Sequence, residues 1–215
     1  MTTAIAKGQR FLFLRRFLHN PREVGAVCPS TRFLGRSMLL DLDLRPGDLI
    51  VEYGPGTGAL TQEIRRAIRP IDGVRYLGIE SEAGFCDVLR QRMPELQFAN
   101  ARVEQIEQLL AERDLPRPKA IISGLPLIFL PAMEEIVSTA YQVLDHGGTF
   151  RTFSYVQSYI TPGARRLRRA MRDRFDRFRI ARLVARNFPP ALVLQGDKSA
   201  NAEAGSCAEL VLSAK

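Results

Sequence analysis

The chain contains 215 residues, 46% of them hydrophobic, and carries a formal net charge of +8. This length suits one globular domain with appended helices, and it can bury a substantial core. With only two histidines in the chain, a zinc site or a serine triad is disfavoured, so no metal is expected. No stretch approaches the roughly 20 apolar residues that a membrane-spanning helix requires.

The first expected element is a basic amphipathic helix within residues 1–30. Phenylalanines and leucines share this segment with arginines, and no acidic residue precedes Glu23. A helix of this composition can lie in a membrane interface, and its expected contacts are Phe11, Arg15 and Arg16. The alternative is a helix that packs on the edge of the sheet.

Residues 31–197 are expected to form the main domain, whose first strand, 48–53, runs into a glycine-rich turn. Glycines at a strand-to-helix turn remove the Cβ atoms that would keep a ligand off the backbone. The helix that follows, near 60–69, presents its N-terminus to that ligand. We therefore predict a nucleoside-binding loop. Its residues are Glu52, Tyr53, Gly54, Gly56, Thr57 and Gly58.

Two acidic residues decide which nucleoside fits the loop. Glu80 ends the second predicted strand, 75–80, and can accept hydrogen bonds from ribose hydroxyls. The spacing of Gly54 and Gly56 also satisfies a loose dinucleotide fingerprint, but Glu52 would repel a pyrophosphate. S-adenosylmethionine carries an ammonium and a sulfonium group. The carboxylate therefore favours this cofactor, with S-adenosylhomocysteine as the product, over a nicotinamide dinucleotide.

Strand and helix signals alternate through the rest of the main domain, as in an α/β fold. The chain is predicted to form an open seven-stranded, mostly parallel sheet with helices on both faces. The further helices are expected at 83–92, 103–113 and 132–144, and the further strands at 96–99, 120–123, 149–155, 179–186 and 191–195. The tail, 198–215, is expected to be separate and could add a strand within 208–212.

The excess of positive charge is concentrated in residues 165–186. This segment holds ten arginines against two aspartates, which equals the +8 of the whole chain. A local excess of this kind indicates an anionic surface, either lipid or nucleic acid. The alternative is a solvated helix face. Arg165, Arg168 and Arg169 are the expected contacts.

Substrate residues are expected after the fourth and fifth strands, because ligands of α/β sheets lie beyond the carboxyl ends of the strands. The hydroxyl of Ser123 or the carbonyl of Leu125 could orient an amine. Tyr155 could relay a proton or hold a cationic headgroup with its ring. Nitrogen-methylating enzymes often carry Asn-Leu-Pro-Tyr after the fourth strand. Here Ser123 replaces the Asn and Leu127 the aromatic ring, which weakens the case for a flipped base.

Five segments together resemble the soluble bacterial phospholipid N-methyltransferases, which are similar to the ribosomal RNA adenine dimethylases. The segments are 21–30, 52–58, 123–127, 152–155 and 187–191. The resemblance implies a class I methyltransferase fold. It also implies conversion of phosphatidylethanolamine to its mono-, di- and trimethylated forms, the last being phosphatidylcholine.

The same resemblance assigns further cofactor residues and a location. Ser81 follows the ribose acid, and Asn100-Ala101 stands where the family often has Gly-Asp at the adenine. A cytoplasmic protein on the inner face of the membrane is implied, and three cysteines without a CxxC pair agree with reduced thiols. Another aminolipid such as ornithine lipid, ribosomal RNA, and a catalytically silent binding module are the alternatives.

Overall fold

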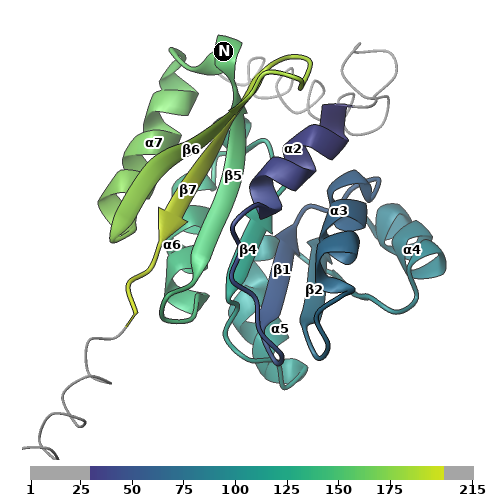
Figure 1. Ribbon diagram of the computed structural model, residues 1–215. Coiled ribbons are helices and arrows are strands. Elements are labelled where there is room, and N and C mark those ends of the chain that lie inside the picture. Colours follow the sequence, from purple (N-terminus) through teal and green to yellow (C-terminus); the bar gives the residue numbers. More distant parts are fainter. Residues whose placement is uncertain (1–29, 201–215) are drawn as a thin grey trace, which may run out of the picture.

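The computed structural model describes residues 30–200, which form a three-layer α/β domain (Figure 1). Seven strands make one sheet in the order β3-β2-β1-β4-β5-β7-β6. Strands β1 to β5 pair in parallel, whereas β7 is antiparallel to both β5 and β6. The predicted seven-stranded, mostly parallel sheet with helices on both faces is confirmed.

The strands are short and follow the predicted order. They are β1 Leu49–Tyr53, β2 Arg75–Glu80, β3 Gln97–Asn100, β4 Ala120–Ser123, β5 Thr149–Tyr155, β6 Arg177–Val184 and β7 Ala191–Asp197. The helices are α2 Ser30–Leu39, α3 Ala59–Ile68, α4 Ala83–Arg92, α5 Ile106–Glu112, α6 Met133–Val143 and α7 Pro162–Arg174. Three 3-10 turns are η1 Val103–Gln105, η2 Leu127–Phe129 and η3 Val156–Ser158.

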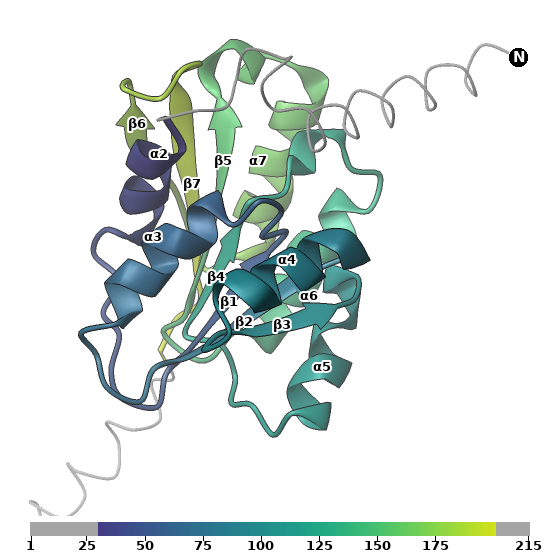
Figure 2. The same cartoon turned by 90° about the vertical axis from the view of Figure 1, so that its right-hand side faces the viewer.

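Helices cover both faces of the sheet, as the two views at right angles show (Figures 1 and 2). Every residue of β1 is buried, as expected for a central parallel strand with helices on either side. Its side chains alternate between the faces: Val51 and Tyr53 join the cluster under α5, α6 and α7, whereas Ile50 joins the cluster under α2, α3 and α4. This alternation places Glu52 on the face of α2, α3 and α4.

The arginine-rich segment is divided between two elements. Helix α7 takes its first half and edge strand β6 its second half. Helices α2 and α7 are not among the elements that the sequence predicts. The start of α7 is nevertheless locally encoded, since the Thr161 hydroxyl accepts the Ala164 N–H at 3.3 Å and Pro162 occupies the first turn.

Helix α2 is held to the sheet by a buried arginine on β5. Arg151 Nη1 donates to the carbonyls of Met38 at 3.0 Å and Leu40 at 2.6 Å. Carbonyls at the end of a helix lack partners within the helix, so the guanidinium caps α2. Burial lowers the pKa of Arg151 to about 10.

Several sequence predictions lie outside the described residues. They are the N-terminal helix with Phe11, Arg15 and Arg16, and the strand within 208–212. Within residues 30–200, no helix has the length and apolar character needed to cross a membrane.

Candidate active site

The predicted site residues meet at the carboxyl edge of the sheet. Backbone hydrogen bonds join the ends of neighbouring strands: the N–H of Gly54 donates to Ile79 at 3.0 Å, and that of Gly124 donates to Tyr53 at 2.8 Å. The Ala101 N–H donates to the carbonyl of Glu80 at 3.0 Å. Loops that follow β1, β2, β3 and β4 are therefore linked in one row.

The glycines of the loop after β1 have two different roles. Gly54, Gly56 and Gly58 all have positive φ, at 70°, 54° and 82°. A Cβ on Gly54 would collide with the side chain of Leu125, and one on Gly58 would lie 2.7 Å from Leu89. A Cβ on Gly56 would meet no atom closer than 4.0 Å. Gly54 and Gly58 thus permit close packing, whereas Gly56 leaves the outer side of the loop open.

Glu80 is buried and fixed between the glycine loop and the turn after β2. Its Oε2 accepts the Gly56 N–H at 2.9 Å, and its Oε1 accepts the Glu82 N–H at 3.0 Å. The exposed Asn100 supports the same turn, because its side-chain amide donates at 3.0 Å to the carbonyls of both Glu80 and Ser81. The acid stands at the end of β2, as a ribose contact requires.

Glu52 lies beneath the loop and is fully buried. The Tyr76 hydroxyl donates to its Oε2 at 2.5 Å, while Oε1 has no hydrogen-bond partner among residues 30–200. Burial raises the pKa of Glu52 to about 7, against the opposing effects of the Tyr76 and Thr61 hydroxyls. A buried carboxylate with an unpaired oxygen fits a cationic partner, and S-adenosylmethionine supplies one. Contact of Glu52 with the cofactor stays a prediction.

Tyr76 is the site residue that the sequence does not single out. The parallel register pairs Ile50 with Tyr76 and Glu52 with Gly78. A Cβ at Gly78 would lie 2.7 Å from the Tyr76 hydroxyl oxygen, so the glycine gives the phenol room to reach the carboxylate. Only the register of β1 on β2 brings Glu52 and Tyr76 together, and a local sequence motif carries no information on that register.

The remaining loop residues divide between core and surface. The Tyr53 ring is fully buried, 6.4 Å from the ring of Phe150, so a ligand on the loop would meet the backbone of Tyr53. Thr57 and Ser81 are exposed, and Ala101 is half-buried. Among the described residues, no group of three or more His, Cys, Asp and Glu side chains could hold a metal ion.

The segment after β4 rests directly on the glycine loop. A Cβ on Gly124 would lie 3.0 Å from the Gly54 carbonyl oxygen, so the absence of a side chain at Gly124 permits this close approach. The buried Ser123 hydroxyl accepts the Leu125 N–H at 3.3 Å, and the Leu125 carbonyl accepts the Leu127 N–H at 2.9 Å. A carbonyl oxygen has two lone pairs, and the Leu127 N–H uses one of those on Leu125. The Leu125 carbonyl therefore retains a lone pair that can accept from an amine. Leu127 itself is buried.

Tyr155 lies half-buried at the end of β5, and its ring meets Phe153 edge to face at 5.6 Å. Burial raises the pKa of the Tyr155 phenol. A raised pKa keeps the phenol protonated at neutral pH, which disfavours a proton-accepting role and favours an aromatic wall or a hydrogen-bond donor.

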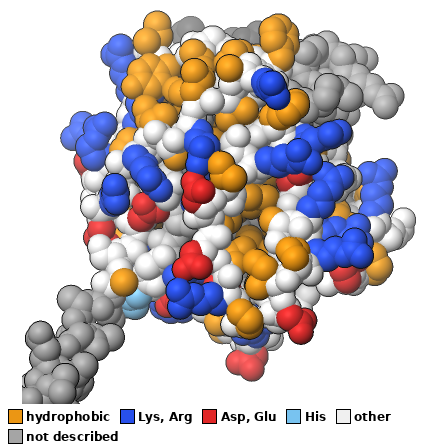
Figure 3. Space-filling view, viewed as in Figure 1, with side chains coloured by type: hydrophobic (Ala, Val, Ile, Leu, Met, Phe, Trp, Pro, Cys, Tyr) orange, Lys and Arg blue, Asp and Glu red, His pale blue; other side chains and the backbone are white. Residues whose placement is uncertain are grey.

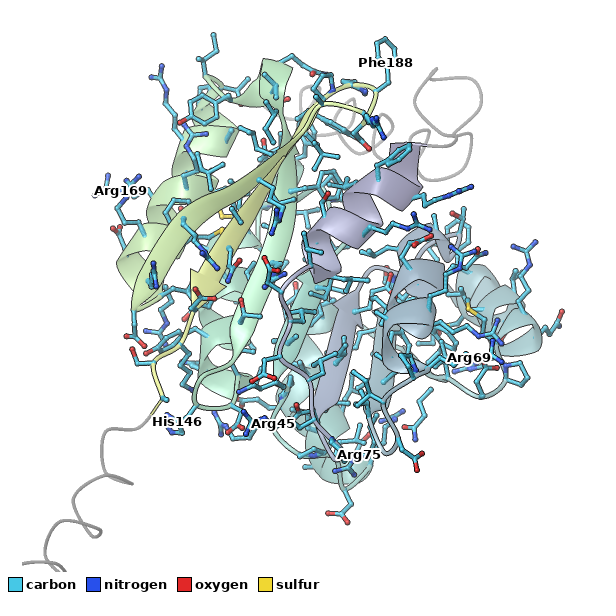
Figure 4. All side chains as sticks on the ribbon, viewed as in Figure 1. Arg45, Arg69, Arg75, His146, Arg169 and Phe188 are labelled. Atoms are coloured by element: carbon cyan, nitrogen blue, oxygen red, sulfur yellow. The ribbon has the colours of Figure 1, made fainter. Side chains whose placement is uncertain are left out.

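The three predicted surface arginines lie on α7, which begins near the same edge. The Arg168 guanidinium lies 3.8 Å from the Tyr159 ring centroid, and its Nη1 donates to the Tyr159 carbonyl at 2.9 Å. Arg169 points outward and forms an exposed ion pair with Asp173 at 3.4 Å (Figure 4). Arg165 is also exposed.

Comparison with known proteins relates the chain to methyltransferases, although no family model matches it. The ornithine lipid N-methyltransferase of Singulisphaera acidiphila is 27% identical over 145 residues, which cover 65% of this chain and 74% of that protein. The ribosomal RNA small subunit methyltransferase A of Thermotoga neapolitana is 27% identical over 122 residues. That match covers 56% of this chain and only 44% of the relative.

A solved structure supports the fold assignment. The magnesium protoporphyrin IX methyltransferase of Synechocystis, solved with bound S-adenosylmethionine, has a TM-score of 0.60 at 14% identity. The similarity covers 88% of this chain and 97% of that protein. The sheet and its helices therefore have the Rossmann-like methyltransferase fold.

Proposed function

This chain is a class I S-adenosylmethionine-dependent methyltransferase, and we propose that it methylates the amine nitrogen of a membrane aminolipid. One observation carries the choice of acceptor. Leu127 is buried where a base-methylating enzyme places an exposed ring, so the site lacks that platform for a flipped base. The relative from Singulisphaera, which is matched over most of its length, agrees with an aminolipid acceptor.

The residues of the site would act mainly by positioning. Bound S-adenosylmethionine supplies a methyl group on a sulfonium, whose sulfur leaves readily as a neutral thioether. The nitrogen–carbon bond forms as the carbon–sulfur bond breaks, and the electron pair of that bond stays on sulfur. Orientation alone can contribute about 7–11 kcal/mol in favourable cases.

Each group of residues would have a separate task. The loop around Gly56 and the carboxylate of Glu80 would hold the nucleoside, with Glu52 beneath its cationic end. The Leu125 carbonyl would aim the amine, whose proton leaves to solvent. The ring of Tyr155 would contact the headgroup, which becomes a permanent cation as methyl groups accumulate.

Two headgroups share the required amine. Phosphatidylethanolamine is implied by the sequence resemblance, and ornithine lipid is named in the Singulisphaera relative. Expression in a host that lacks methylated lipids, with and without ornithine lipid, distinguishes them by mass spectrometry of the extracted lipids. We expect methylated species of one headgroup from the parent chain. Gly56→Ala should abolish them, whereas Glu107→Gln, a change at an exposed position on α5, should not.

A ribosomal RNA adenine is the second candidate, favoured by the Thermotoga relative. Methylation of 16S rRNA but of no lipid by the purified protein would replace the lipid proposal. A catalytically silent module would show no thermal stabilisation by S-adenosylmethionine or S-adenosylhomocysteine.

We place the protein on the cytoplasmic face of the membrane. Residues 1–30 and the arginines of α7 are the proposed contacts with anionic lipid, at about 1 kcal/mol for each arginine near the surface. Binding to anionic vesicles that weakens as salt rises would support this placement.

A further inference from the structure

We propose that an apolar rim beside the active site inserts into the membrane surface and seats the site over the lipid headgroups. The rim consists of Val156, Ile160 and Phe188. This inference rests on the proposed lipid substrate, and its partner is an anionic bilayer.

The rim side chains are unusually exposed for their size. Val156 is 41% exposed, Ile160 73% and Phe188 77%. Phe188 lies at the tip of the turn between β6 and β7 and points away from the protein (Figure 4). Hydrophobic side chains gather at the same end of the molecule in the space-filling view (Figure 3). Clustered apolar exposure of this kind marks an interaction surface.

Contacts between distant segments make the rim continuous. The Val156 N–H donates to the carbonyl of Pro190 at 2.9 Å, which joins η3 to the turn that carries Phe188. At the start of α7, a Cβ on Gly163 would collide with the carbonyl of Ile128, so this turn packs closely on η2. The two segments that carry the rim are therefore joined to each other, and η2 supports one of them.

The charge around the rim suits an anionic bilayer. The three segments, 126–132, 156–165 and 186–190, contain no aspartate or glutamate, and their charged residues are Arg165 and Arg186. Both arginines are exposed, and Arg168 borders the rim through Tyr159. Apolar side chains bordered by cations match the boundary between headgroups and acyl chains. Val156 and Ile160 are aliphatic and offer no ring to a nucleobase, so among the three rim side chains only Phe188 could stack on RNA, whereas all three can insert among acyl chains.

The rim adjoins the proposed acceptor site through the chain itself. Val156 directly follows Tyr155, and η2 follows the segment of Ser123 and Leu125. A bilayer seated on the rim would therefore present its amines beside the groups proposed to orient them. Residues at the ends of β4 and β5 would reach the headgroup without extraction of the lipid.

The test compares two double variants of the full chain by vesicle flotation. Ile160→Ser with Phe188→Ser removes the two most exposed rim side chains. Leu40→Ser with Val88→Ser is the control away from the rim. Leu40, just after α2, is 49% exposed, and Val88, on α4, is 40% exposed. Far-UV circular dichroism verifies that both variants fold.

On phosphatidylglycerol vesicles, the rim variant should lose roughly tenfold or more in partition coefficient, while the control stays near the parent. Phosphatidylcholine vesicles should bind the parent more weakly. Unchanged partition of a folded rim variant would overturn the proposal and leave residues 1–30 as the membrane contact. A change in oligomeric state without a change in partition would assign the rim to a second copy instead. If the rim effect holds but no aminolipid is methylated, the proposed function fails while the rim remains a membrane surface.

Discussion

Replacement of Glu52 by glutamine should make the stability of the protein less sensitive to pH. Burial raises the pKa of Glu52 from its ordinary 4.5 to about 7. Between these values the folded protein keeps a proton that the unfolded chain releases. The free energy of unfolding therefore decreases as pH rises, because the protonated form is the one that the fold favours.

The size of the effect follows from the two pKa values. Each pKa unit corresponds to about 1.4 kcal/mol, so the change from 4.5 to about 7 amounts to about 3 kcal/mol. This stabilisation is complete below the unfolded pKa and is lost as pH rises through the folded one. Glu52→Gln stays uncharged and still accepts from Tyr76. Relative to the parent, the variant should gain about 3 kcal/mol between about pH 5 and about pH 8.

Urea unfolding followed by circular dichroism measures this difference, since the chain contains no tryptophan. Glu107→Gln, at an exposed position, is the control. A gap between variant and parent that does not change over this pH range would refute the assignment of Glu52 as a titrating group. The variant should also be stabilised less by S-adenosylmethionine, because it lacks a charge for the cationic end of the cofactor.

Three further substitutions test local geometry. Gly56→Ala should lower stability by only about 1 kcal/mol, since its Cβ meets open space, yet it should abolish stabilisation by S-adenosylmethionine; an unchanged ligand response in a thermal-shift assay would contradict this. Arg151→Met should cost about 2–3 kcal/mol in urea unfolding, because the carbonyls of Met38 and Leu40 at the end of α2 lose a charged donor. A loss below about 0.5 kcal/mol would show that this cap contributes little. Gly196→Ala would drive a methyl group into the Phe175 ring and should lower the free energy of unfolding in urea by about 1–3 kcal/mol. An unchanged free energy of unfolding would mean that the ring moves aside at no cost.

The sheet and the glycine loop could be predicted because their signals are local. A central parallel strand is a continuous apolar run, as in β1, and glycines at its end mark a sharp turn. Strand β5 matches its predicted range, whereas β6 ends two residues before its predicted end, at Val184. The carboxyl-edge rule then placed Glu80 and Ser123 together without any knowledge of register.

The rest depends on contacts between segments far apart in the chain. The pair of Glu52 and Tyr76 requires the register of β1 on β2. The rim requires the bond between Val156 and Pro190, which are 34 positions apart in the sequence. The sequence predicted a strand at 179–186, in the second half of the arginine-rich segment, but charge counting did not reveal α7 in the first half, because arginine is tolerated on the exposed side of a helix or a strand.

The carboxyl edge also departs from the rules that stabilise a fold. Glu52 has an unpaired buried oxygen, Gly56 holds a left-handed turn where no packing demands the missing Cβ, and Phe188 is exposed. Each feature lowers or fails to increase the stability of the isolated domain. Such departures are expected at functional sites, where a ligand or surface compensates for them. In the proposed function a cationic nucleoside would compensate for the first two and a bilayer for the third, which is why we propose that donor, acceptor and membrane meet at the same edge.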